Sequence, residues 1–146
     1  MQIRKSVTIC SFVHVNLDEQ KAAFGCANTS NDDVPDDEWT RIFESHNDLI
    51  RTALNKGETV VQETASTTRE WRARARKTAQ DLGFAPYVIF VDISESVIWK
   101  RWQQNAINHS RYHTPKNVLS AYIQEFERPS ADENVLRYDE SIPLIK

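Results

Sequence analysis

The sequence predicts an α/β fold in which a mainly parallel sheet is flanked by helices. Short segments rich in β-branched and aromatic residues alternate with longer segments whose apolar residues recur at helical spacing. The three glycines, Gly25, Gly57 and Gly83, each follow an apparently helical stretch, where a helix C-terminus often uses glycine. Strands that alternate with helices imply βαβ crossovers, and these connect parallel strands.

Strands are predicted where apolar residues alternate or run together. They span residues 11–15, 58–63, 87–92 and 135–138. The segment 87–92, YVIFVD, is almost entirely apolar, so we expect it to be covered on both faces.

The most strongly indicated helix lies between Pro35 and Gly57. Proline suits a first helical position, and the acidic residues at 36–38 favour the positive end of the helix dipole. The residues expected on its buried face are Trp39, Ile42, Phe43, Leu49, Ile50, Ala53 and Leu54.

Four further helices start at recognisable capping signals. Asn16 is placed to cap a helix over 17–24, Thr67 with Glu70 forms a capping box, and Ser94 and Pro115 precede the last two. In the helix after Thr67, the expected apolar face is Trp71, Ala75, Ala79 and Leu82. Its expected solvated side is Arg72, Arg74, Arg76 and Lys77.

Length and composition narrow the class of protein. A chain of 146 residues is the usual size of one domain, so we expect a single domain over residues 1–146. The formal net charge of −3 gives no basic excess for nonspecific nucleic-acid binding. No apolar run approaches the roughly 20 residues of a membrane span, and no signal peptide is apparent. We therefore expect a cytoplasmic protein that does not bind membranes.

Several segments together resemble a known family. They are the acidic pair after the first strand, GETVVQETASTTRE at 57–70, YVIFVDIS at 87–94 with Arg101 in the following helix, and FERPSADE at 126–133. Their order resembles that of the ATP-binding kinase-like P-loop proteins related to polynucleotide kinase and gluconate kinase. The resemblance runs from about residue 12 to residue 139 and implies a three-layer P-loop kinase-like fold, with residues 105–114 as the lid connection.

The phosphate-binding loop of that family has no counterpart here. A strand followed by G-x-x-x-x-G-K-[S/T] should precede residue 12. In the stretch MQIRKSVTICS only Lys5–Ser6 matches, and it matches the last two positions of that motif. We therefore expect an N-terminally incomplete domain whose first, central strand is missing or replaced. The neighbouring strands would then pair directly, recruit residues 7–10, exchange strands in a homo-oligomer, or remain unstable.

The resemblance assigns roles to residues that follow the strands, where parallel sheets bind ligands. It implies Asp18 as the general base, Glu63 as a carboxylate near Mg²⁺, and Arg69, Arg101 and Arg111 as phosphate contacts. The structural alternatives are an acidic residue at the helix dipole for Asp18, a solvent-facing charge for Glu63, and solvated charges for the arginines.

The implied activity is phosphoryl transfer from ATP to a hydroxyl of a small molecule or a nucleic-acid end, with ATP and Mg²⁺ as cofactors. Because the loop motif is absent from these residues, we expect the chain alone to bind ATP weakly or not at all. The alternative is a non-catalytic remnant or binding module of the same fold. A misassigned start or an interrupted gene would also explain the missing motif.

Overall fold

The computed structural model describes residues 11–110 and 112–139. The chain divides into two compact units, Met1–Thr64 and Ala65–Lys146, and each is described by itself. Within the described ranges, no helix combines the length and apolar character needed to cross a membrane.

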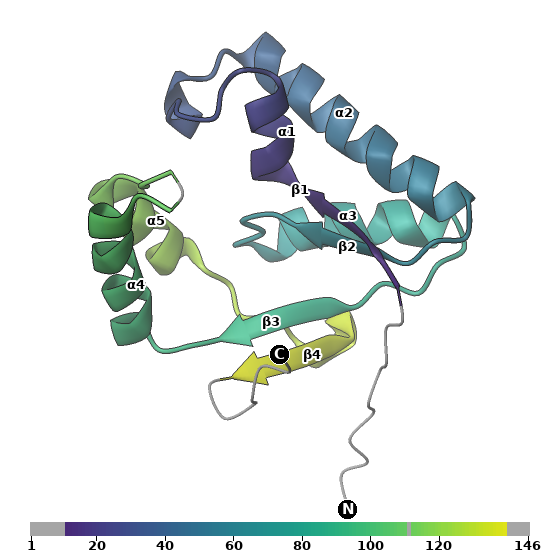
Figure 1. The fold of residues 1–146 in the computed structure, drawn as a ribbon. Coiled ribbons are helices and arrows are strands. Elements are labelled where there is room, and N and C mark those ends of the chain that lie inside the picture. The colour runs from purple at the N-terminus through teal and green to yellow at the C-terminus, as the bar shows by residue number, and fades with distance from the viewer. Residues whose placement is uncertain (1–10, 111, 140–146) are drawn as a thin grey trace, which may run out of the picture. The chain divides into compact units, whose positions relative to one another are not determined.

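Among its described residues, unit 1 has a parallel strand pair and two α-helices (Figure 1). Strand β1 (Val13–Asn16) pairs with β2 (Val60–Glu63), and the register sets Asn16 opposite Glu63. Between these strands run α1 (Leu17–Ala23), a short 3-10 helix η1 (Asn31–Asp33) and α2 (Asp36–Asn55). The predicted parallel pairing is confirmed for this unit.

Helix α2 supplies most of the apolar core of unit 1. Its buried residues are Ile42, His46, Ile50, Ala53 and Leu54. The prediction placed Leu49 in this set, but Leu49 is 45% exposed, and the buried row instead includes a histidine. His46 lies four residues from both Ile42 and Ile50, so it shares their helix face. A helix face chosen by hydrophobicity alone therefore left out His46.

His46 links α2 to the sheet. Its Nε2 atom lies 3.1 Å from Gln62 Nε2 on β2, while its Nδ1 atom is buried without a hydrogen-bond partner in the described part of the chain. Gln62 is opposite Val15 in the register, so their side chains lie on the same face of the β1–β2 pair. Val15 is buried and Gln62 contacts His46, so this is the face that α2 covers. The opposite face carries His14, Asn16 and Glu63, since successive side chains alternate.

A buried lysine holds the loop after α1. Lys21 Nζ donates to Thr29 O and, at 2.9 Å, to Asn31 Oδ1, and it lies 5.9 Å from the centre of the Trp39 ring. The polar loop is therefore fixed by its own carbonyl and amide oxygens around one cation, as a buried charge requires.

In its described part, unit 2 has a second parallel strand pair and three α-helices. Strand β3 (Val88–Asp92) pairs with β4 (Val135–Asp139) in parallel, as predicted. The helices are α3 (Arg69–Asp81), α4 (Glu95–Asn108) and α5 (Lys116–Glu125), and a 3-10 helix η2 spans Ala131–Glu133. Helix α4 continues through Asn108, so the connection to α5 is shorter than the predicted 105–114.

The face of α3 differs from the predicted one. Arg72 is 6% exposed and binds Glu133, which is fully buried, through Nε (2.8 Å) and a second nitrogen (3.2 Å). This hydrogen bond, more than any other cause, lowers the pKa of Glu133 to about 2. Trp71, predicted to be buried, is 48% exposed. The prediction placed Arg72 on the solvated side of the helix, and it had no means of locating the carboxylate 61 residues away in the sequence.

The helix start also shifts by one residue. Thr68, rather than Thr67, is the N-cap of α3, and its side chain accepts a hydrogen bond from Trp71 N (3.3 Å). Thr67 instead donates to Glu125 at the end of α5. Arg74 and Lys77 are exposed and pair with Glu70 and Asp81, as expected of a solvated side.

Strand β3 is covered on one face only. Phe90 stacks on Phe126 (5.7 Å between ring centres), whereas Ile89 and Val91 are 53% and 51% exposed. The prediction that both faces are covered is therefore wrong for the described residues. The apolar sequence of the strand does not itself supply the second covering layer.

The two parallel pairs form separate two-stranded sheets, β1–β2 and β3–β4. Direct pairing of β2 with β3, one of the arrangements considered for a missing central strand, would join the two units and stays a prediction. Residues 7–10, the predicted substitute, lie outside the described residues.

Candidate functional site

The carboxyl edge of the β1–β2 pair gathers the acidic candidates of unit 1. Glu63 ends β2 directly opposite Asn16, which ends β1. Asp18 follows within the first turn of α1. The two residues that the resemblance singled out therefore come from adjacent ends of parallel strands, where ligands of such sheets bind.

Asn16 connects these two positions. Its Oδ1 atom accepts a hydrogen bond from Asp18 N (2.7 Å), which caps α1 as predicted. Its Nδ2 atom donates to Glu63 Oε2 (3.3 Å). One side chain thus sets the start of the helix and orients the carboxylate. The sequence indicated the cap, but the second contact depends on strand register.

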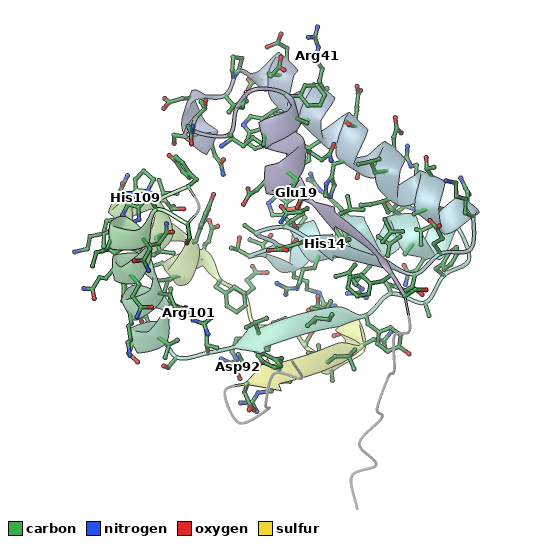
Figure 2. The ribbon with its side chains drawn as sticks, in the orientation of Figure 1. His14, Glu19, Arg41, Asp92, Arg101 and His109 are labelled. Atoms are coloured by element: carbon green, nitrogen blue, oxygen red, sulfur yellow. The ribbon has the colours of Figure 1, made fainter. Side chains whose placement is uncertain are left out.

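His14 is a further partner of Glu63. Its Nε2 atom lies 2.9 Å from Glu63 Oε2, and the two side chains are 42% and 64% exposed. Figure 2 labels His14 on β1 and Glu19 on α1. The structure places His14 on the sheet surface, beside the candidate metal ligand Glu63.

Asp18 is exposed at the N-terminus of α1. Its backbone N–H is satisfied by Asn16, and among the described residues its carboxylate has no hydrogen-bond or ion-pair partner. A carboxylate that is free to accept a proton is what a general base requires.

Glu63 fits a magnesium ion of the kind that keeps most of its waters. The contacts of its carboxylate with His14 and Asn16 both use Oε2, so among the described residues Oε1 remains available. Mg²⁺ in phosphoryl-transfer sites typically takes one or two protein carboxylates, with waters and phosphate oxygens for the rest. Among residues 11–110 and 112–139, no group of three or more candidate ligands occurs, so an all-protein cage is not formed there.

Unit 2 holds the arginine candidates. Arg69 at the start of α3 binds Asp132 with both guanidinium nitrogens and also reaches Ser130. These contacts raise the pKa of Arg69 and lower the pKa of Asp132, the hydrogen bond between the two being the largest cause. Arg69 is thereby held to the η2 segment, and its assignment as a phosphate contact stays a prediction.

Arg101 has a free guanidinium. It lies on the exposed side of α4 (Figure 2), with no ion pair or hydrogen bond to any other described residue. Arg111 lies outside the described residues. Their predicted roles as phosphate contacts are not tested by this geometry.

A further charged cluster lies at the carboxyl edge of the β3–β4 pair, where the end of a predicted strand pointed to Asp92 but not to its partners. Asp92 Oδ2 accepts a hydrogen bond from Arg128 (2.8 Å) and forms an ion pair with Arg137 Nε (2.7 Å). The Arg128 guanidinium lies 5.0 Å from the centre of the Phe90 ring. Arg128 and Arg137 come from separate segments, so the only possible signal was the position of Asp92 at the end of a strand.

Comparison with known proteins assigns this sequence to a family. Residues 3–129 match the family described as AAA domain. The chain belongs to the AAA domain family. This is a family of nucleotide-binding P-loop domains, and the recognition of a P-loop kinase-like chain is confirmed.

Solved structures agree on the fold. A gluconokinase from Sinorhizobium meliloti 1021 has a TM-score of 0.58 at 19% identity, with 92% of this chain and 71% of that chain covered. A sugar kinase from Janibacter sp. HTCC2649, in an unliganded structure, has a TM-score of 0.57 at 16% identity, with 90% and 72% covered. No curated protein matches the sequence. The α/β fold with parallel strands flanked by helices is confirmed.

Proposed function

We propose that this AAA domain chain is an ATP-dependent phosphotransferase that acts on a hydroxyl group. One observation carries the proposal: Asp18 and Glu63 lie at neighbouring carboxyl ends of a parallel strand pair, joined through Asn16. Family membership supports ATP as the phosphate donor.

In this proposal the residues of unit 1 accept the proton of the acceptor hydroxyl and bind the metal ion. Asp18 accepts the proton of the attacking hydroxyl, because its carboxylate is exposed and not already paired in the described structure. Glu63 holds Mg²⁺ through its free oxygen, while His14 and Asn16 fix its other oxygen. The bound ion would supply neutralisation of charge on the phosphates.

Arginines stabilise the transferring phosphoryl group. We assign this role to Arg101, Arg69 and Arg111. Arg101 has no ion pair or hydrogen bond to another described residue. The acceptor class follows the solved neighbours, a gluconokinase and a sugar kinase, so a sugar or sugar acid is tried first. An oligonucleotide with a 5′-hydroxyl tests the nucleic-acid alternative.

The test compares ATP turnover with these acceptors in wild-type protein and in Asp18→Asn, Glu63→Gln and Glu19→Gln. Removal of a general base should lower turnover by about 10²–10⁴-fold in Asp18→Asn. Glu63→Gln should raise the Mg²⁺ concentration needed for half-maximal rate. Glu19→Gln, an exposed neighbour on α1, is the matched control. Equal rates in all four proteins would refute the enzyme proposal.

A second candidate is a non-catalytic binding module of the same fold. It is favoured by the state of Arg69, whose guanidinium is already bound to Asp132 and Ser130 rather than open to a phosphate. Calorimetric titration with ATP and Mg²⁺ separates the two proposals. Micromolar binding supports the enzyme, and undetectable binding supports the module.

A further inference from the structure

Strand β3 has a free hydrogen-bonding edge in the described part of unit 2. Val88 N donates to Asn134 O (3.3 Å), so the amide of Val88 faces β4. Backbone groups of successive strand residues point to alternate edges, so those of Ile89 and Val91 point away from β4. Among the described strands β3 pairs with β4 alone. The backbone N–H and C=O groups along this edge can therefore hydrogen-bond to another extended strand.

The same strand presents a bare apolar face. Ile89 and Val91 lie on this face and are 53% and 51% exposed, and Tyr87, directly before the strand, is 53% exposed. On the other face Phe126 stacks against Phe90. Large apolar side chains in an uninterrupted row are a mark of an interaction surface.

Burial in unit 2 is incomplete in the described structure. Its buried side chains are Arg72, Asn105 and Glu133, all polar or charged. The buried hydrophobic residues of the described chain all lie in unit 1: Val15, Val34, Ile42, Ile50, Ala53 and Leu54. Unit 2 therefore has apolar surface whose burial would stabilise it at about 25 cal/mol per Å².

The edge also lacks the features that usually prevent strand association. Exposed edges are normally blunted by charged residues, especially lysine, by proline or by bulges. Residues 87–91 contain no charge and no proline, and the flanking residues are Pro86 and Asp92.

We propose that β3 pairs antiparallel with β3 of a second copy of this chain, across a twofold axis, in a β4–β3–β3–β4 sheet. A twofold pairing brings the same residues together, so it requires a segment free of like charges. With Ile89 opposite Ile89 of the second copy, Val91 faces Tyr87 and Asp92 faces Pro86. Each charge then meets an uncharged residue, and the interface is self-complementary.

The first experiment measures the mass in solution by light scattering and sedimentation over a wide concentration range. The wild-type chain should be a dimer, and Ile89→Lys and Val91→Lys should be monomers with unchanged circular dichroism. Ile107→Lys is the matched control, because Ile107 is 78% exposed on α4 and away from the strand. A monomeric wild type, or a dimer that survives both β3 substitutions, overturns the proposal.

A second experiment tests the register without relying on the stability of a variant. Residues directly opposite in a hydrogen-bonded antiparallel pair have Cα atoms about 5.5 Å apart, within disulfide range. In a Cys10→Ser, Cys26→Ser background, Ile89→Cys should form a covalent dimer under mild oxidation, and Ile107→Cys should not. Equal cross-linking of both variants contradicts the proposed pairing.

Discussion

At the scale of single residues, Asn16 has two separate functions in unit 1. Its carbonyl oxygen caps α1, and its amide nitrogen donates to Glu63. The two functions use different atoms of one side chain, so substitutions can separate them.

Asn16→Ala should lower the free energy of unfolding by about 0.5–2 kcal/mol, because the cap is lost. Asn16→Asp should keep the cap but place a second carboxylate against Glu63, and so change Mg²⁺ dependence more than stability. Chemical denaturation and metal titration measure the two effects. Asn28→Ala, in the exposed part of the following loop, serves as the control and should leave both unchanged.

His46 makes the stability of unit 1 depend on pH. Burial lowers the pKa of His46 from its ordinary value of 6.5, so the folded state favours the neutral ring. Since the unfolded chain binds the proton more readily, stability is fully present above pH 6.5 and falls as the pH drops below it.

We expect His46→Leu to flatten this part of the stability profile, measured by denaturation at a series of pH values. His109→Asn is the control, because His109 is exposed and its φ of 48° is one that asparagine tolerates. A wild-type slope retained in His46→Leu would assign the dependence to another group.

At the scale of elements, the link between α3 and η2 includes a buried ion pair. Arg72 and Glu133 are 6% and 0% exposed, and Arg76 lies 3.5 Å from the same carboxylate. A buried charge that loses its partner is strongly destabilising, whereas an exposed pair contributes little.

Arg72→Met should therefore cost about 3–5 kcal/mol of unfolding free energy. Arg74→Met removes an exposed pair with Glu70 on the same helix and should cost about 1 kcal/mol or less. Equilibrium urea denaturation compares the two variants. Similar losses in both would show that burial of the Arg72 pair does not govern its contribution.

At the scale of the whole molecule, the two units differ in what they bury. Unit 1 encloses an apolar core around α2, and the buried centre of unit 2 is polar and charged among the described residues. Local stability follows buried apolar contact, so the units should open with different free energies.

Amide hydrogen exchange measures this difference. Amides of α2 near Ile50 and Leu54 should exchange more slowly than those of α4 and α5, because only the former lie over a buried apolar core. Slow exchange in all three helices to the same extent would mean that the chain opens as a single cooperative unit.

The sequence by itself determined the order and type of the elements. Strand and helix periods, the cap at Asn16 and the positive φ angles at Gly25, Gly57 and Gly83 are local properties, and the structure bears them out. Parallel pairing also followed, because helices between strands leave little alternative. The positions of Asp18 and Glu63 at the carboxyl edge came from this same local order.

Only the tertiary structure decided which side chains meet. Glu63 with His14, Arg72 with Glu133, and Arg128 with Asp92 are 49, 61 and 36 residues apart. Burial of Arg72 and exposure of Ile89 are the reverse of what hydrophobicity alone suggests. A charged side chain can be buried when it is paired with an opposite charge, and an apolar strand face stays exposed unless another segment packs on it. Such contacts depend on register and packing between distant segments, which no local pattern records.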